Sequence, residues 1–334
     1  MTTHAYSDIW HQILAWCECG DWISLFITGS TAMRHHLNSA PQFTGPTTSY
    51  PALSHFRGLQ RLPLIQQLPP AAAMSFTFSP VLTTFCYQGM SYDAKLLQAL
   101  PPTITSLFVS IRESSSNFPV VELDAIPLCV SSLSLKMSSQ VQWSYGSVPI
   151  TRSALQSLEL SLPAFNSYTM YHLISTAPNL TSFTCNRWIP PKDEEEAPLF
   201  INPKLIKLLD ITIPYGTKLW YLGLLKHLQQ FPHARIRLDY GGSIAPEHGV
   251  AKPLPHNVVA LRCSTVDPAL LPVSLTELTI TSNVNFTNEA GLVHLTSLTT
   301  LSLAKSREVM VPSSVTRLTH SNKISGMVMI PSDG

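Results

Sequence analysis

One short pattern of apolar residues recurs along most of the chain. It consists of an apolar residue, two variable residues, a second apolar residue, one variable residue and a third apolar residue, as in ITSLFV. Side chains of a strand alternate between its two faces, so the second and third apolar residues share one face and each copy predicts a half-buried β-strand. The clear copies begin at Leu82, Ile104, Val130, Leu155, Leu180, Val258, Leu275, Leu298 and Val315.

Two weaker copies fill the gap between Leu180 and Val258. The first begins at Ile206 rather than one residue earlier, because the other register would point Asp210 inward, and the second begins at His233. Successive copies then start 17 to 27 residues apart. Each unit is too small to bury its own apolar edge, so the pattern predicts a stacked repeat array.

The segments between the copies contain stops and amphipathic stretches. Proline ends a preceding helix and leads into an extended segment, and it stands three residues before the first apolar position at Pro101, Pro127, Pro255, Pro272 and Pro312. Apolar residues three and four apart predict helices over 93–100, 168–176, 218–231 and 289–295. The 17-residue intervals before Leu275 and Val315 predict a return by loop alone, and His320 in a third apolar position marks the end of the array.

The phrases PVSLTEL, PSSVTRL and PPTITSL resemble the irregular leucine-rich repeats of F-box proteins. The resemblance covers roughly residues 80 to 320 and implies an α/β solenoid, an irregular horseshoe with a parallel sheet on its concave face. The asparagine that usually follows the strand in this superfamily occurs here only at Asn283.

The amino-terminal segment SDIWHQILAWCECGDWISLFITGSTAMRHHL is similar to the F-box, a trihelical motif. Ala5 and Tyr6 replace the Leu-Pro pair with which that motif begins, and Ala32 and Met33 replace its usual aromatic residue. The resemblance implies docking onto a Skp-type adaptor, and through it onto a cullin, by a surface formed or supported by Ile9, Ile13, Leu14, Trp16 and Leu25. The alternative is an amphipathic helical cap for the first repeats, which any solenoid needs.

These patterns predict four parts of the chain. An F-box-like helical unit spans 1–40, a proline-rich linker 41–58, the repeat domain 59–322 and a tail 323–334. The repeat assignment within 53–80 stays open.

Composition narrows the possible partners. Lys and Arg total 21 against 20 Asp and Glu, so the net charge is +1, and only 12% of residues are charged. A chain without a dense basic stripe gains little from counterion release, which argues against a nucleic acid or an anionic membrane as partner. No apolar run reaches the ~18 residues of a membrane span, and no basic segment precedes a signal-like stretch, so we expect a cytoplasmic or nuclear protein.

Candidate catalytic chemistry is sparse. The chain contains no phosphate-cradling glycine loop, nucleophile elbow or HExxH motif, so we expect neither an enzyme nor a cofactor. Cys17, Cys19 and His11 do not have the spacing of a four-ligand zinc site. Cys185 and Cys263 occupy third apolar positions and are expected to be buried.

The predicted concave face is lined mainly by hydroxyls, with charges in the middle of the array. Arg237 and Arg262 occupy equivalent positions of consecutive repeats, so we expect them about 4.8 Å apart, with Arg235 beside them. Such a pair can grip a carboxylate or phosphate of a protein substrate. An equally acceptable interpretation is a cross-strand pair of Asp210 and Arg237 that only solvates the sheet.

Two functions from different classes are compatible with these features. The first is a non-catalytic substrate receptor of a cullin-RING ubiquitin ligase, in which the amino-terminal helices bind the adaptor and the repeat face holds an unidentified protein substrate. The second is a leucine-rich-repeat scaffold or inhibitor without a ligase role, in which the helices are only a cap.

Overall fold

The structure, a computed structural model, divides into two compact units. The N-terminal unit is drawn from Met1–Ala164 and His172–Asn179, and the C-terminal unit from Phe165–Tyr171 and Leu180–Gly334. The residues that the structure describes are 61–65, 80–89, 94–111, 120–137, 142–144, 150–161, 173–188, 202–214, 221–245, 252–284, 291–306, 309–320 and 328–329.

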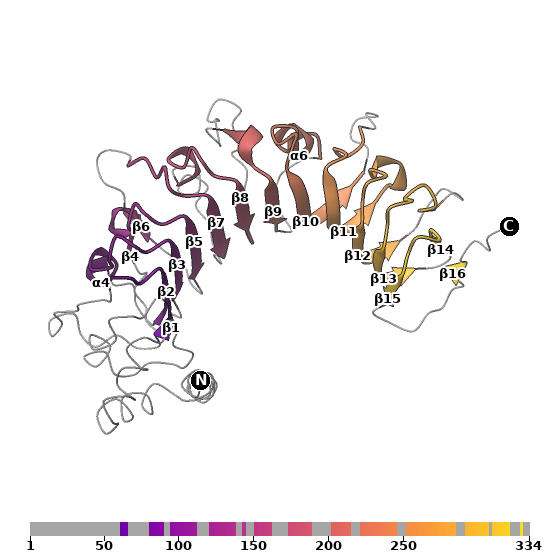
Figure 1. Cartoon of the computed structure of the whole chain (residues 1–334). Coiled ribbons are helices and arrows are strands. Elements are labelled where there is room, and N and C mark those ends of the chain that lie inside the picture. Colours follow the sequence, from indigo (N-terminus) through magenta and orange to yellow (C-terminus); the bar gives the residue numbers. More distant parts are fainter. Residues whose placement is uncertain are drawn as a thin grey trace, which may run out of the picture. The chain divides into compact units, whose positions relative to one another are not determined.

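Parallel strands pair side by side in the described part of the N-terminal unit (Figure 1). Leu107 lies opposite Phe85 on one side and Leu133 on the other, and Leu133 lies opposite Leu158, so the second apolar residues of successive repeats are in register. The strands, in spatial order, are β1 (Arg61–Ile65), β2 (Thr84–Gly89), β3 (Ser106–Ile111), β5 (Ser132–Met137) and β7 (Ser157–Ser161).

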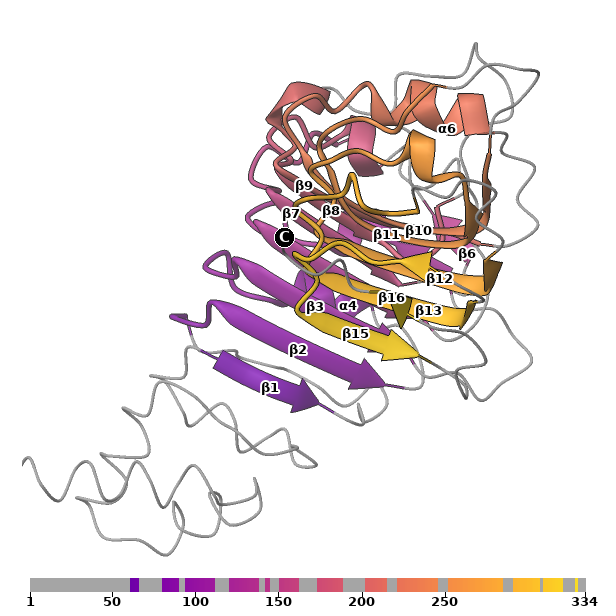
Figure 2. The ribbon, with the colours of Figure 1, turned by 90° about the vertical axis from the view of Figure 1, so that its right-hand side faces the viewer.

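The C-terminal unit repeats the same arrangement. Leu278 lies opposite Leu261 and Leu301, and Leu301 lies opposite Leu318, again in parallel register. Figure 2 shows the arrows of the last strands pointing the same way. The described strands, in spatial order, are β8 (Ser182–Cys185), β9 (Leu208–Ile213), β10 (Arg235–Ile244), β11 (Val258–Val266), β12 (Glu277–Val284), β13 (Thr300–Ser306) and β15 (Arg317–His320).

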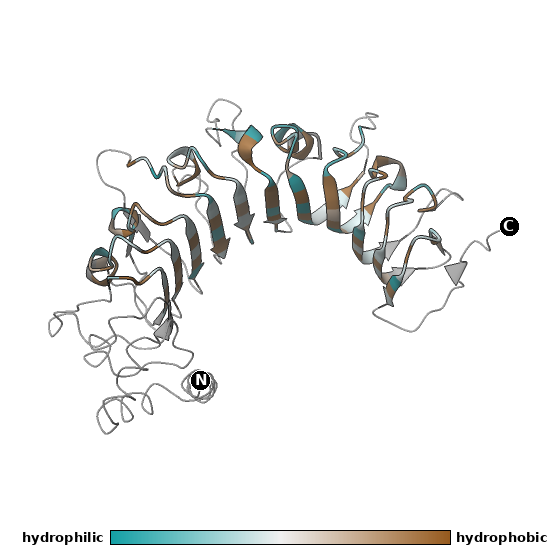
Figure 3. Ribbon diagram, viewed as in Figure 1, coloured by the Kyte–Doolittle hydropathy of each residue, from teal (hydrophilic) through white to brown (hydrophobic). Residues whose placement is uncertain are grey.

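The recurring apolar triplets form the buried side of the described strands, except in the last repeat, where Leu318 is 37% exposed. Ile104, Leu107 and Val109 are at most 1% exposed, and buried and half-buried residues alternate along β3. Figure 3 shows this alternation as bands of hydrophobic and hydrophilic colour along the strands. The predicted phase is therefore confirmed in both units. It also holds at the weaker copy, where Ile206 is 1% exposed and Leu205 is 43% exposed.

One copy of the pattern begins a residue later than predicted. His233 is exposed, whereas Ala234 is 1% exposed and its N–H donates to the Phe231 carbonyl, as the first apolar residue of other repeats does to the residue three before it. The alternation continues beyond the predicted Leu238 to Tyr240, and β10 is ten residues long. The sequence pattern pointed to His233, because His233 stands three residues before Ile236, as the first apolar residue does in the other copies. Ala234 stands only two residues before Ile236.

A tight turn precedes many of the described strands, and it explains the spaced prolines. The Ile104 N–H donates to the Pro101 carbonyl at 3.1 Å and the Val258 N–H to the Pro255 carbonyl at 3.0 Å. The same bond follows Pro127, Pro272 and Pro312. The proline carbonyl accepts this hydrogen bond, and the first position of the turn needs no N–H donor. Proline therefore fits this position without the loss of a hydrogen bond.

Arg152 stands where other repeats have this proline, and it is 5% exposed. Its Nη1 donates to the Ile126 carbonyl at 3.1 Å, and its Nη2 donates to the Leu123 carbonyl. A buried guanidinium thus satisfies carbonyls of the preceding repeat, which contains the 3₁₀ turn η3 (Leu123–Ala125).

Helices are few and shorter than predicted in the part of the chain that the structure describes. The stretches 93–100 and 218–231 contain α4 (Ala94–Gln98) and α6 (Tyr221–Leu228). Of the helix expected over 289–295, residues 291–294 form turns instead, because Gly291 has φ of 52°, which a right-handed helix excludes.

The short intervals return without an α-helix, as predicted for their described residues. A 3₁₀ turn, η6 (Pro268–Leu270), precedes β12, and the short strand β14 (Val309–Met310), which pairs with β16 (Val328–Met329), precedes β15. The remaining elements are the paired strands β4 (Val120–Glu122) and β6 (Gln142–Ser144) and the 3₁₀ turn η5 (Pro203–Leu205). The described units are therefore solenoid-like stacks of parallel strands with few helices.

Candidate interaction surface

The exposed side of β9 to β12 in the C-terminal unit carries the charged residues singled out in the sequence. Arg235 is exposed, and the side chains of Arg237 and Arg262 are 47% and 60% exposed. They alternate with buried apolar residues, because side chains one apart on a strand point to opposite faces. Six residues on this side, which we call the charged face, are the exposed Arg235, Arg237 and Arg262 and the half-buried Asp210, Asp239 and Glu277.

The strand β10 changes register between its two neighbours. Ile236 lies opposite Leu209 of β9, whereas Leu238 lies opposite Leu261 of β11. The pairing with β11 skips Val259, which has no partner in the register. An irregularity of this kind shifts every later residue pair along the strand.

This register corrects the expected arginine pair. Asp239, not Arg237, lies opposite Arg262, and Arg237 lies between Asp210 on β9 and Ala260 on β11. Residues two apart along a strand are about 6.6 Å apart, so the two guanidiniums do not start from neighbouring positions. The side-by-side clamp for a carboxylate or phosphate is not assembled in this structure.

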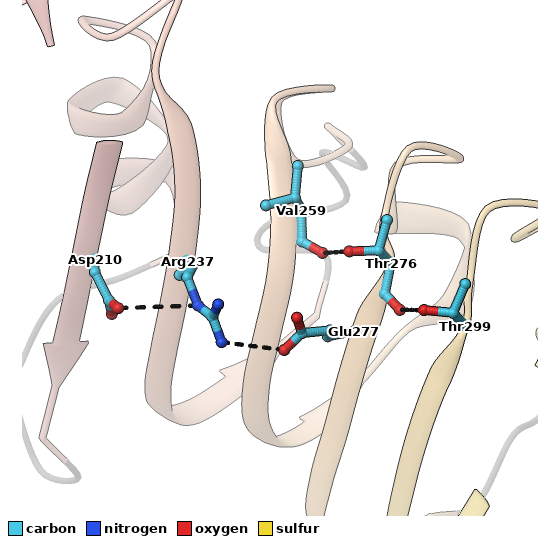
Figure 4. A network of polar contacts seen from close by, with 6 residues as sticks. All are labelled: Asp210, Arg237, Val259, Thr276, Glu277 and Thr299. Atoms are coloured by element: carbon cyan, nitrogen blue, oxygen red, sulfur yellow. Dashed lines mark hydrogen bonds and ion pairs between the residues drawn. The ribbon is translucent and has the colours of Figure 1, made fainter. Parts of the chain in front are cut away.

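The charged face instead contains ion pairs within the molecule (Figure 4). Arg237 Nη2 is 3.1 Å from Glu277 Oε2, and Arg237 Nε is 3.9 Å from Asp210 Oδ2. Arg262 Nε is likewise 3.9 Å from Asp239 Oδ2. The cross-strand pairing of Asp210 and Arg237 that the sequence left open is thus present.

Ala260 explains how Arg237 reaches a carboxylate two strands away. Ala260 lies opposite Arg237 on one side and opposite Glu277 on the other. Its small side chain leaves the space over β11 to the long arginine, and Ala260 itself is only 8% exposed.

The carboxylates of Asp210 and Asp239 interact only weakly with the arginines opposite them. Burial raises the pKa of Asp210, Arg237 opposes that shift, and the like charges of Asp239 and Glu277 add to it. Burial also raises the pKa of Asp239, against the effect of Arg262. The distances of 3.9 Å are too long for good charge-assisted hydrogen bonds, which fits these directions.

Hydroxyls directly after the first apolar position bond to the neighbouring strand. Thr276 Oγ1 donates to the Val259 carbonyl at 2.8 Å, and Thr299 Oγ1 donates to the Thr276 carbonyl at 3.1 Å (Figure 4). In the N-terminal unit, Ser131 Oγ donates to the Thr105 carbonyl at 3.0 Å. These hydroxyls, predicted to offer hydrogen bonds to a partner, already link repeat to repeat.

A second set of polar side chains lies just before the strands. Asn257 Nδ2 donates to the Phe231 and Ala234 carbonyls at 2.6 and 2.8 Å, and Asn179 Nδ2 donates to the Ser153 carbonyl at 2.8 Å. In the leucine-rich repeats that this chain resembles, the asparagine follows the strand, whereas here it precedes the strand, a position that was not predicted. The recurring Thr, Ser or Asn immediately before the first apolar residue was the available signal.

The N-terminal unit has its own polar cluster on the exposed side. Glu159 Oε2 accepts from Ser134 Oγ at 2.8 Å, and Glu159 Oε1 is 3.2 Å from Lys136 Nζ. The same ammonium lies 5.3 Å from the centre of the Phe108 ring. These residues were not predicted as a cluster, although their positions in the repeats place them on the exposed side.

The described cysteines do not provide reactive chemistry. Cys185 and Cys263 are each 1% exposed, which confirms their predicted burial. Burial raises the pKa of each thiol to about 12, so almost no thiolate forms near neutral pH. Among the residues that the structure describes, no cluster of His, Cys, Asp and Glu is suited to a metal ion.

Several predicted sites lie outside the described residues. These are the adaptor-binding residues Ile9, Ile13, Leu14, Trp16 and Leu25. Cys17 and Cys19, for which no zinc site was expected, lie outside them as well. The prediction of an adaptor-binding surface therefore stays a prediction.

The chain matches no protein-family model and no curated protein. Within the described residues, no helix combines the length and apolar character that crossing a membrane requires.

Proposed function

We propose that this protein is a non-catalytic binding protein whose exposed strand faces hold a protein partner. The observation that carries this proposal is the repeated division of each strand into a buried apolar side and an exposed polar side. Stacking of the repeats fixes the backbone, so the exposed side chains are displayed on a rigid surface. The exposed side chains can vary without changing the fold.

The finer proposal is a leucine-rich-repeat horseshoe that serves as the substrate receptor of a cullin-RING ubiquitin ligase. Its support is the resemblance of the repeats and of residues 7–37 to F-box proteins. The F-box-like segment would bind a Skp-type adaptor, and the repeats would hold a protein so that its lysines reach the conjugating enzyme. Such a receptor acts by proximity and needs no catalytic residue.

The charged face suggests how a substrate is contacted. Arg235 is exposed and has no ion pair with a described carboxylate, and Arg262 is 60% exposed beside a loosely held Asp239. Both can turn to a partner, whereas Arg237 is held between two carboxylates. A partner surface with both charge signs therefore fits this face better than a single phosphate group does.

Co-purification with a Skp-type adaptor tests the ligase proposal. The full chain should retain the adaptor under conditions in which an established F-box protein does, because Ile13 and Leu14 would provide apolar contacts. The variant with Ile13→Asp and Leu14→Asp should lose the adaptor. A matched variant with Arg235→Ala and Arg262→Ala should keep it, because its changes are confined to the charged face.

If the wild-type chain retains no adaptor, the receptor role is wrong. The scaffold without a ligase role then becomes the better account of the same strand faces. Retention by the Ile13→Asp and Leu14→Asp variant as well would show that the adaptor binds elsewhere, which also contradicts the assignment of these residues.

A further inference from the structure

The helix α6 of the C-terminal unit carries a histidine with an unsatisfied ring nitrogen. His227 Nδ1 is buried and has no hydrogen-bond partner. The imidazole meets the indole of Trp188 edge to face, with the ring centres 5.5 Å apart and the planes at 73°. Trp188 is 2% exposed and His227 is half-buried, so this contact lies at the margin of the packed interior.

Protonation would be costly at this position. A neutral imidazole can carry its proton on Nε2 and leave Nδ1 as a lone pair, whereas an imidazolium must donate from both nitrogens. A buried N–H without an acceptor costs about 1–3 kcal/mol, and more when it is charged. The ring must therefore leave its site, or recruit an acceptor, when it gains a proton.

The charges around the ring offer no compensation. Burial lowers the pKa of His227 from its usual 6.5, and the charge of Lys226 on the same helix lowers it further. No described carboxylate contributes to its titration. Arg187, next to Trp188 on the segment packed against the ring, is exposed and is itself a cation.

We propose that His227 is an acid-sensitive latch whose protonation releases α6 from Trp188. The helix has only eight residues and is held mainly by Leu224, Leu225 and Leu228, each at most 2% exposed. A helix of two turns has little stability of its own. Release exposes this leucine surface while the strands, joined by their own hydrogen bonds, stay paired.

The direction of the pH effect follows from proton linkage. A base whose pKa is lowered in the folded state stabilises the docked helix above pH 6.5 and loses that stabilisation as the pH falls below 6.5. For a single proton the opening equilibrium rises by up to tenfold for each pH unit between 6.5 and the lowered pKa of the docked imidazole, and it levels off below that pKa.

Hydrogen exchange of residues 221–231 between pH 7.5 and 5 tests the latch, after correction for the intrinsic pH dependence of exchange. Protection of α6 should fall as the pH drops below 6.5, by up to tenfold per pH unit until the lowered pKa of His227 is passed, whereas protection of β12 and β13 should stay constant. His227→Gln should remove the pH dependence. His256→Gln, which changes an exposed histidine, should leave it intact.

Constant protection of α6 across this range would overturn the proposal, as would an equal pH response in His227→Gln. A second measurement does not depend on the variant folding, because it follows the wild-type imidazole in chain labelled with ¹³C at histidine. A His227 pKa at or above 6.5 would also overturn the proposal. These results are independent of adaptor binding.

Discussion

Arg237 is held between two carboxylates, yet neither contact contributes much to the stability of the fold. Its side chain is 47% exposed, and those of Asp210 and Glu277 are 44% and 43% exposed. Ion pairs with this much solvent contact are typically worth about 0–1 kcal/mol. The raised pKa of Asp210 shows that burial outweighs the attraction of Arg237. The charged face is therefore better suited to recognition than to holding the strands together.

Asp210→Asn tests this view at a single residue. An acid whose pKa is raised in the folded state contributes most to stability below its unfolded value of 3.8, and this contribution is lost as the pH rises through the folded pKa. The wild type should thus become less stable relative to Asp210→Asn as the pH rises from 3.5 to 7, by less than about 1 kcal/mol. Urea unfolding at several pH values measures the difference. A variant that is clearly less stable than the wild type at pH 7 would mean that the ion pair dominates.

Among the elements, β10 shows where sequence reasoning reached its limit. The period of two predicted that Ile236 and Leu238 of β10 are buried, because they alternate with charged residues. It did not predict the register, because a shift by two residues leaves the same side chains buried. Contacts that depend on register, such as Asp239 beside Arg262, were therefore missed. The spaced prolines, in contrast, correctly marked tight turns that lead into the strands, because each proline is the first residue of such a turn.

The hydroxyls between strands give a prediction at this scale. Thr276→Val should lower the free energy of unfolding by about 0.5–1.5 kcal/mol, because it removes the donor to Val259 and keeps the branched shape. Thr279→Val is the control, since Thr279 lies on the exposed side of the same strand and should change stability by less than about 0.5 kcal/mol. Chemical denaturation compares the two variants. Equal effects would contradict a structural role for this hydroxyl.

In the molecule as a whole, stability arises between neighbouring repeats. Each strand pairs only with the repeats before and after it, as Leu133 does with Leu107 and Leu158. Such stacks behave as chains of nearest-neighbour interactions, so damage stays local. The sequence predicted this architecture because every repeat carries its own apolar triplet. It could not predict which partner the exposed side binds, because those side chains are free of the packing constraint.

Leu133→Ala should therefore destabilise one region of the chain. The change removes a side chain that is 1% exposed and should cost about 2–5 kcal/mol. Hydrogen exchange should increase in β3, β5 and β7, while β11 to β13 keep their protection. Ser132→Ala, on the exposed side of the same strand, should have little effect on either region. A uniform loss of protection along the chain would contradict local stabilisation.

The most direct test of the stacked parallel strands is a register-specific disulfide between β12 and β13. Thr279 lies opposite Ser302, and Glu277 lies opposite Thr300. Thr279→Cys with Ser302→Cys places two thiols on adjacent strands with Cα atoms about 4.8 Å apart, within disulfide range, whereas Thr279→Cys with Thr300→Cys leaves them about 8 Å apart. After mild oxidation and proteolysis, mass spectrometry should find peptides linked through 279 and 302 and none linked through 279 and 300. Failure of the first link, or equal formation of both, would contradict the stacked parallel register on which the account depends.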